Sequence, residues 1–295
     1  MALPTISKAK AQYIDRDYRS DNTKNNRLSI QLRPDGFSFA QIDSISKKVL
    51  FIEDYQIPIM LGDEAVFQCE KVNLRFETFL SETKLYSQIF KSVHIIIDNS
   101  FFTIVPNVLF KESESDNYLK ITHQLPVNFI IKIDSLTLFE SKNVFGVYAP
   151  LYYTISDYFH QFEFKHFVSL FIYQSAIFQK TKNEAAVYVY VNANNIIILA
   201  FENDKLIFSN SFNFKEKEDF VYYILLIYNQ LKFKTENTPL YFSGNIDSSS
   251  PLYAIAYQYI GDLNFSQQKS GGVIFGKDFP EFAESKYSVL TQAVL

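Results

Sequence analysis

Three short runs near the start of the chain have the pattern of β-strands. Apolar and polar residues alternate over residues 28–33, which is typical of a half-buried strand. Arg33-Pro34-Asp35-Gly36 then has the composition of a tight turn, because proline fixes φ and glycine accepts a positive φ. Residues 37–43 and 49–55 continue as two further strands. Three strands joined by short turns predict an antiparallel meander.

A helical period follows this meander. Phe76, Phe79, Leu80 and Phe90 recur on one face of a helix predicted over 76–90. The next run, residues 93–97, is short, β-branched and apolar on both faces, as expected of a buried strand with parallel neighbours. The first part of the chain therefore has the order β-β-β-α-β.

The same order is predicted again further along the chain. Its members are strands at 185–191, 196–201 and 206–212, a helix at 215–233 and a strand at 240–243. The turn between the first two of these strands is Asn192-Ala193-Asn194-Asn195. A pattern that recurs in this way indicates a domain duplication, although the two copies share almost no sequence identity.

These patterns predict an organisation in two halves. Residues 1–27 form a polar N-terminal arm, 28–167 the first half with an inserted segment, and 168–295 the second half. The remaining predicted elements are strands at 127–133, 144–148 and 162–167, and helices within 113–124, 151–159, 169–180 and 251–259. A closing helix from about residue 280 is expected to pack back on the first half.

The composition adds a constraint on phosphate chemistry. The 295 residues include 30 Phe, 20 Tyr and no Trp, and 47% of the chain is hydrophobic, enough to bury a sizeable core. Glycine is scarce, with 8 residues. Phosphate-binding loops use glycine where the backbone must approach the ligand closely. Neither G-x-G-x-x-G nor G-x-x-x-x-G-K-[ST] occurs, so the chain offers few places for such a loop.

Charge and cysteine content argue against several classes of partner and site. The net charge is −4 and Lys and Arg form no basic stripe, so we expect no nucleic-acid partner. Cys69 is the single cysteine, which excludes an internal disulfide and a cysteine-based zinc site, and we expect no metal site. The longest apolar run, residues 220–228, is about half the length of a membrane span. These features predict a cytoplasmic protein with no direct membrane span.

The order of elements and several segments resemble the actin-like ATPase superfamily. Asn143-Val144-Phe145-Gly146-Val147-Tyr148-Ala149-Pro150 resembles the strand and helix start found in its pilus-assembly and cell-division branch, and Asn203-Asp204-Lys205-Leu206 resembles a polar hairpin turn of that branch. The chain as a whole is most similar to an uncharacterised bacterial family with this fold. The resemblance implies an α/β protein of two ribonuclease-H-like halves, each a mixed sheet with flanking helices.

The resemblance also identifies the positions where a nucleotide site would lie. Members that bind ATP carry Asp-x-Gly at the end of the first strand of each half and a glycine-rich adenosine motif. The corresponding segments here contain Arg33, Asp35 and Gly36, then Asn192 and Asn194, then Ser243, Gly244 and Asn245. No acid ends the first strand, Pro34 removes one backbone donor, and the second turn has neither acid nor glycine. These departures imply that the usual ATP hydrolysis is lost.

Two hypotheses for function follow. The first is a degenerate, non-hydrolysing actin-like protein without catalytic residues or cofactor, which acts as an intracellular scaffold or assembly partner for another protein. The alternative is an ATPase or kinase that binds ATP and magnesium through phosphate loops rebuilt around Arg33, Asp35, Asn192 and Asn194. Ordinary turn chemistry also explains each of these loops without a ligand.

Overall fold

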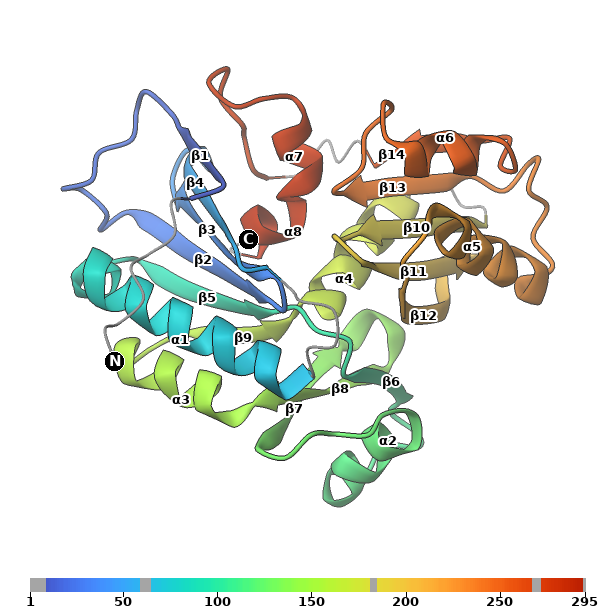
Figure 1. The fold of residues 1–295 in the computed structure, drawn as a ribbon, viewed down its shortest axis with the longest axis horizontal. Helices are drawn as coiled ribbons and strands as arrows, with labels where there is room; N and C mark the ends of the chain where they lie inside the picture. Colours follow the sequence, from blue (N-terminus) through green and yellow to red (C-terminus); the bar gives the residue numbers. More distant parts are fainter. Residues whose placement is uncertain (1–8, 59–64, 181–184, 267–271, 294–295) are drawn as a thin grey trace. The chain divides into compact units, whose positions relative to one another are not determined.

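The computed structural model describes residues 9–58, 65–180, 185–266 and 272–293. Contacts divide the chain into two compact units. The first unit comprises Met1–Leu170, Ser270–Pro280 and Val289–Leu295, and the second comprises Phe171–Lys269 and Glu281–Ser288. Each unit contains a mixed sheet with flanking helices (Figure 1), so the predicted α/β class is confirmed.

The main sheet of the first unit contains the predicted meander. Its strand order is β1-β4-β3-β2-β5-β9. The strands are β1 (Ala11–Ile14), β2 (Asn26–Arg33), β3 (Gly36–Asp43), β4 (Val49–Gln56), β5 (Ser92–Ile97) and β9 (Glu163–His166). Strands β2, β3 and β4 pair antiparallel, whereas β5 pairs parallel with both β2 and β9. Parallel neighbours on both sides explain why β5 is apolar on both faces.

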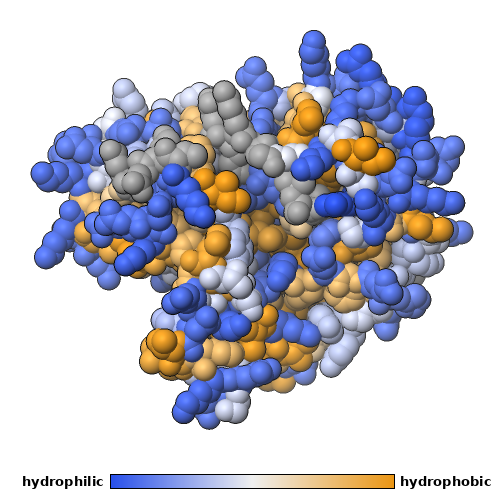
Figure 2. Space-filling view, turned by 180° about the vertical axis from the view of Figure 1, so that it is seen from behind, coloured by the Kyte–Doolittle hydropathy of each residue, from blue (hydrophilic) through white to orange (hydrophobic). Residues whose placement is uncertain are grey.

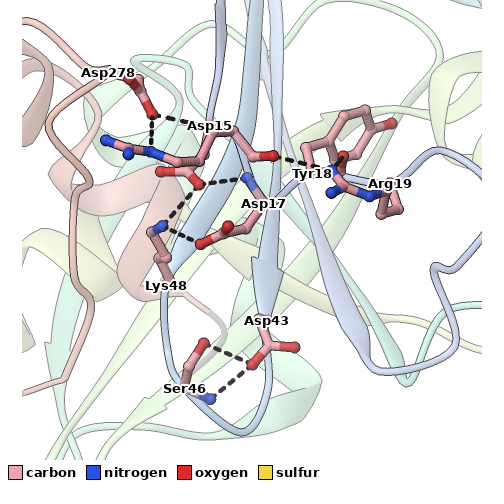
Figure 3. Close-up of polar contacts among 9 residues, drawn as sticks. Asp15, Asp17, Tyr18, Arg19, Asp43, Ser46, Lys48 and Asp278 are labelled. Atoms are coloured by element: carbon pink, nitrogen blue, oxygen red, sulfur yellow. Dashed lines mark hydrogen bonds and ion pairs between the residues drawn. The ribbon is translucent and has the colours of Figure 1, made fainter.

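Strand β1 is a difference from the sequence-based expectation, which leaves residues 11–14 in a polar arm. Its four residues pair antiparallel with the outer edge of β4. Asp15 and Asp17 follow β1 directly, and Lys48 lies in the turn before β4. Lys48 Nζ contacts Asp15 Oδ1 at 2.7 Å and Asp17 Oδ2 at 2.6 Å, as Figure 3 shows. Asp15 is buried at 1% exposure, so this contact anchors the segment that follows β1 to the turn before β4.

Two helices cover one face of this sheet. Figure 1 shows α1 (Ala65–Thr83) and α3 (Ala149–Tyr158) side by side along it. Phe76 and Phe79 lie on the apolar face of α1, and their ring centroids are 5.3 and 5.2 Å from the ring centroid of Phe37. The prediction of one helix over 76–90 is wrong at both ends. Helix α1 begins at Ala65, and after it Lys84 takes a left-handed φ of 51° and a separate 3-10 turn, η1 (Leu85–Ser87), follows.

The segment inserted after β5 forms a small sheet of its own. Its order is β6-β8-β7, with both pairs antiparallel. The elements are β6 (Phe102–Pro106), η2 (Glu112–Glu114), α2 (Ser115–Thr122), β7 (Phe129–Leu136), η3 (Thr137–Phe139) and β8 (Ser141–Tyr148). Helix α2 packs against β6 and β8. Strand β6 was not anticipated, because its five residues end in a proline and lack clear alternation.

The second unit repeats the strand order of the first. Its sheet has the order β12-β11-β10-β13-β14, in which β10, β11 and β12 form an antiparallel meander and β13 and β14 continue in parallel. The elements are α4 (Phe167–Gln179, which begins in the first unit), β10 (Ala186–Val191), β11 (Asn195–Glu202), β12 (Lys205–Asn213), α5 (Lys217–Leu231), β13 (Leu240–Gly244), α6 (Pro251–Tyr257) and β14 (Leu263–Phe265). Without β1 and with β14 in the place of β9, the two main sheets share one topology.

The central part of helix α5 is apolar, and it packs against this second sheet. Phe220, Ile224 and Tyr228 are buried with Val189 and Phe242 in one core cluster. The helix begins with a capping box, in which the side chains of Glu216 and Asp219 each accept a hydrogen bond from the other's backbone N–H. Burial against the sheet and α6 accounts for much of its apolar surface, whereas Tyr222 and Leu226 are exposed.

The predicted closing helix over 280–295 is wrong as a single element. Two five-residue helices replace it, α7 (Phe282–Lys286) and α8 (Ser288–Gln292). The break falls at Tyr287, whose φ of −105° and ψ of 18° leave helical geometry. Residues 294 and 295 lie outside the described part of the chain, as does Gly271 of the glycine cluster near the C-terminus.

The large aromatic and aliphatic content lies mainly in the sheets and the helices that cover them, with a remainder at the surface. Tyr188 and Tyr241 stack at 5.2 Å within the second sheet. On the face seen in Figure 2, hydrophobic residues form patches between hydrophilic ones. Among the described residues, no helix is both long enough and apolar enough to cross a membrane.

Candidate functional site

The first candidate loop is closed by an ion-paired cluster. Arg33 is the last residue of β2, and its Nε donates to Asp35 Oδ1 at 3.0 Å. Its Nη2 donates to Asp54 Oδ1 at 2.8 Å, and its Nη1 donates to Ser38 Oγ at 2.5 Å. Ser38 Oγ in turn donates to Asp54 Oδ1 at 2.7 Å. Thus all three guanidinium nitrogens are engaged by side chains of the same three-stranded meander.

Burial strengthens the charge interactions within this cluster. The side chains of Arg33 and Asp54 are 13% and 5% exposed. Burial acts to lower the pKa of Arg33, but the neighbouring carboxylates of Asp35 and Asp54 outweigh it and raise that pKa above its usual range. One cation therefore faces two carboxylates, and the turn presents no uncompensated positive charge to a phosphate.

The backbone of the same turn is committed to internal contacts as well. Ile57 N–H donates to the Asp35 carbonyl at 2.7 Å, and Gln68 Nε2 donates to the Pro34 carbonyl at 2.5 Å. Gly36 has a φ of 142°, and a Cβ at this position would overlap the carbonyl oxygen of Tyr55. The glycine thus allows β3 to lie close to the end of β4, which is a structural role.

The second candidate loop is an ordinary tight hairpin between β10 and β11. Asn192 N–H donates to the Asn195 carbonyl at 2.8 Å, which closes the turn. The carbonyl of Asn194 accepts from Phe214 N–H at 2.9 Å, so the loop also continues the pairing with β12. The Asn194 side chain is exposed. The loop offers neutral amide groups at the surface and no charge.

The third candidate loop lies next to the second, because β10 and β13 are parallel and end together. Asn245 N–H donates to the Val191 carbonyl at 2.7 Å. Gly244 has a φ of 89°, and a Cβ there would overlap that same carbonyl oxygen. Ser243 is buried, and its Oγ has no hydrogen-bond partner among the described residues. Gly244 is therefore required for the close approach of the two strand ends.

The structure groups the predicted site residues by unit. Arg33, Asp35 and Gly36 form one cluster in the first unit, whereas Asn192, Asn194, Ser243, Gly244 and Asn245 lie at one end of the second sheet. In the part of the chain that the structure describes, no group of three or more His, Cys, Asp or Glu side chains could hold a metal ion. Nucleotide binding by these residues stays a prediction.

Ser38 and Asp54 were not anticipated as members of the first cluster. Both lie inside predicted strands, and the signal that could have identified Asp54 is a charged residue within the apolar run 49–55. A second buried pair lies at the carboxyl ends of β2 and β5, where Gln31 Nε2 donates to Asp98 Oδ2 at 2.9 Å. Open α/β folds place ligands at this edge, and here the carboxylate is bound by a neighbouring amide.

A buried polar cluster joins β9 to the small sheet of the first unit. Asp134 of β7 accepts a hydrogen bond from His166 N–H at 2.8 Å, and Asn143 of β8 donates to Ser169 Oγ at 2.9 Å. The His166 side chain is fully buried, its Nδ1 accepts from Val168 N–H at 3.3 Å, and burial lowers its pKa to about 3. The buried His166 ring thus contacts the backbone at the start of α4, and its burial favours the neutral form.

The two repeated sheets define a protein of the actin-like ATPase fold. A Bacteroides thetaiotaomicron protein with an actin-like ATPase fold and unknown function superposes with a TM-score of 0.71 at 24% identity, covering 82% of this chain and 91% of that one. A chain of a PilM–PilN type IV pilus biogenesis complex gives a TM-score of 0.54 at 10% identity, with 90% and 96% covered.

Residues 15–263 match the model of one protein family, and the chain belongs to that family, described as "Protein of unknown function (DUF3822)". No curated protein matches the chain.

Proposed function

We propose that this chain is a non-hydrolysing actin-like protein that acts in the cytoplasm as a scaffold or assembly partner, without a nucleotide cofactor. The observation that carries the proposal is the Arg33 cluster. The guanidinium that could have bound a phosphate contacts Asp35, Ser38 and Asp54 instead. A phosphate entering this turn would have to displace a buried ion pair and would meet two carboxylates.

The second unit supports the same proposal. Gly244, the glycine at the expected adenosine position, lies against the Val191 carbonyl. This close contact explains the glycine without a ligand. The neighbouring Asn192–Asn195 turn carries no charge with which to hold magnesium or phosphate. The similar fold in the PilM–PilN complex belongs to a protein that assembles with a partner protein, and an assembly role for this chain is consistent with that.

Thermal unfolding in the presence of nucleotide tests the proposal that the chain has no nucleotide cofactor. A ligand that binds only the folded state stabilises it by mass action, by about 2.7 kcal/mol at a hundredfold excess over Kd. We expect ATP with magnesium to shift the melting temperature no more than magnesium with inorganic tripolyphosphate, which controls for a general anion effect. A larger shift with ATP would overturn the proposal and support the alternative of an ATP-binding enzyme with rebuilt phosphate loops.

The assembly role needs a separate measurement. Chemical cross-linking of the tagged chain in the cells that produce it, followed by purification, should recover a partner protein at a fixed ratio to the chain. Recovery of the chain with no stoichiometric partner would contradict the assembly role. A partner that co-purifies equally with an unfolded variant would contradict it too, because such binding would not depend on the fold.

A further inference from the structure

Strand β12 is a long edge strand, and Lys205 at its start is its charged residue. It lies at the end of the second sheet, and no described strand pairs with its outer side. From Leu206 to Phe214 the sequence contains no charged residue and no proline. Natural edge strands are usually shortened, charged or covered, because an open edge pairs with other chains. In the first sheet the corresponding strand, β4, is covered by β1.

The hydrogen-bonding groups at this edge can be assigned from the pairing of β12 with β11. Phe214 N–H donates to the Asn194 carbonyl, so 194 and 214 form a hydrogen-bonded pair. Such pairs alternate in an antiparallel ladder, and the register places Ile198 opposite Asn210. Phe208, Asn210 and Phe212 therefore bond to β11, whereas Ser209, Ser211 and Asn213 direct their backbone groups outward. The regular pairing starts at Phe208, because the register shifts between Ala200 and Phe201.

A local contact agrees with this assignment. The N–H of Ser211 is bound by the Oδ1 of Asn210 at 2.8 Å rather than by a strand. Asn210 is exposed. An incoming strand would replace this single side-chain contact with backbone hydrogen bonds on both sides of Asn210.

The sequence of the edge is palindromic. Residues 208–212 are Phe-Ser-Asn-Ser-Phe. When two copies of a strand pair antiparallel about a two-fold axis at Asn210, position 208 lies opposite 212, and 209 opposite 211. Every residue of this segment then faces one of its own kind. Aromatic pairs and pairs of hydroxyl side chains are favourable across strands.

We propose that β12 pairs antiparallel with β12 of a second copy of this chain, with Asn210 opposite Asn210 on the two-fold axis. In this register the outward backbone groups of Ser209 in each copy meet those of Ser211 in the other copy. The contact is isologous, so it closes into a dimer and joins two five-stranded sheets into one.

The side chains beside this edge suit a second copy. The rings of Phe208 and Phe212 are stacked with centroids 6.4 Å apart, and Phe212 also stacks on Tyr223 of α5 at 4.7 Å. Residues four apart in a strand are separated by about 13 Å, so the two rings lean together beside the axis. The second copy would bring the same three rings against them, forming an apolar cluster across the interface.

Charged residues flank the uncharged stretch on both sides. Asp204 and Lys205 precede it, and Lys215 and Glu216 follow it. In the proposed register 204 lies opposite 216 and 205 opposite 215, so like charges meet there, and the ladder is confined to the uncharged stretch between them.

This inference deepens the proposed assembly function and rests on it for its biological role. The two fail separately, because nucleotide binding and partner recovery test the proposed function, whereas the mass of the purified chain tests the β12 contact. Sedimentation equilibrium over a wide concentration range should show the wild-type chain approaching twice its 34.3 kDa mass.

A charge swap on the axis then tests the register. Asn210→Lys places two lysines directly opposite each other, and Asn210→Glu places two glutamates there. Each variant alone should raise the dimer dissociation constant at least about tenfold, because like charges in contact are costly. An equimolar mixture of the two should recover association, since lysine then faces glutamate. Gln230→Lys, an exposed change of equal charge on α5, should leave association at the wild-type level.

Circular dichroism of each variant verifies that it is folded. A wild-type chain that stays at the monomer mass throughout would overturn the proposal. So would Asn210→Lys and Asn210→Glu variants that dimerise as the wild type does, or a mixture that associates no better than either variant alone.

Discussion

Arg33 Nη2 donates to Asp54 Oδ1 across 2.8 Å, and Ser38 Oγ donates to the same carboxylate oxygen. The contact links the end of β2 to β4 across the intervening strand β3, so one arginine ties together all three strands of the first meander. Removing one member of a buried ion pair leaves an uncompensated charge, which costs far more than removing a pair at the surface.

The first prediction concerns stability. Arg33→Met keeps much of the apolar volume but leaves Asp35 and Asp54 without their cation. We expect the free energy of unfolding to fall by about 3–5 kcal/mol, measured by urea denaturation at pH 7. Arg16→Met is the matched control, because Arg16 is 68% exposed and contacts Asp278 at 3.4 Å.

For the control we expect a loss of less than about 1 kcal/mol, as is typical of exposed pairs. If the two substitutions lower the free energy of unfolding equally, Arg33 does not hold the meander together as described. A variant with Arg33→Met and Asp54→Asn together should recover part of the loss, because it removes one of the two stranded carboxylates.

The second prediction concerns pH. The pKa of His166 is lowered to about 3 in the folded chain, against about 6.5 for an unperturbed histidine. Below pH 6.5 the unfolded chain binds a proton that the folded chain does not. The stability contributed by neutral His166 is therefore fully present above pH 6.5 and declines as the pH falls toward 3, by up to about 1.4 kcal/mol per pH unit.

The comparison with His166→Asn isolates this effect. Asparagine offers an oxygen that can accept the Val168 N–H in place of Nδ1, but it does not titrate. We expect the unfolding free energy of the variant to fall less steeply than that of the wild type between pH 6.5 and 4. His160→Asn at an exposed position is the control. Parallel pH profiles for wild type and His166→Asn would refute the assignment.

The third prediction concerns the turn after β13. Gly244→Ala forces a Cβ toward the Val191 carbonyl at a φ of 89°, and we expect a loss of about 1–3 kcal/mol. The adjacent Ser243→Ala should be neutral or slightly stabilising, because its buried hydroxyl has no partner among the described residues. Chemical denaturation of both variants measures the contrast. Equal losses would show that Gly244 has no special backbone role.

Much of the fold follows from local patterns. Turn chemistry at Arg33-Pro34-Asp35-Gly36 and at Asn192–Asn195 determines two hairpins, and the structure has both where they are predicted. The apolar run 93–97 determines a strand buried on both faces, which β5 is. These signals are reliable because alternation, φ preferences and apolar runs act within a few neighbouring residues.

Helix ends and short strands depended on more distant contacts. Residues 11–14 have no distinct strand pattern, and they become β1 because the edge of β4 supplies hydrogen-bond partners. The helical pattern continued past Lys84 and Tyr287, but backbone geometry at these residues breaks it. Such outcomes are decided by packing partners that the local sequence does not contain.

The candidate site shows the same division. The sequence determined that no acid ends the first strand and that the turn at Asn192–Asn195 has neither acid nor glycine, where the resemblance implies Asp-x-Gly in members that bind ATP. Only the tertiary structure decided what Arg33 does instead, because Asp54 lies 21 residues away and meets it through the pairing of three strands. The palindrome at 208–212 is likewise visible in the sequence, but its meaning depends on β12 being an edge strand with outward amides. A residue's type is local, whereas its partner is set by the fold.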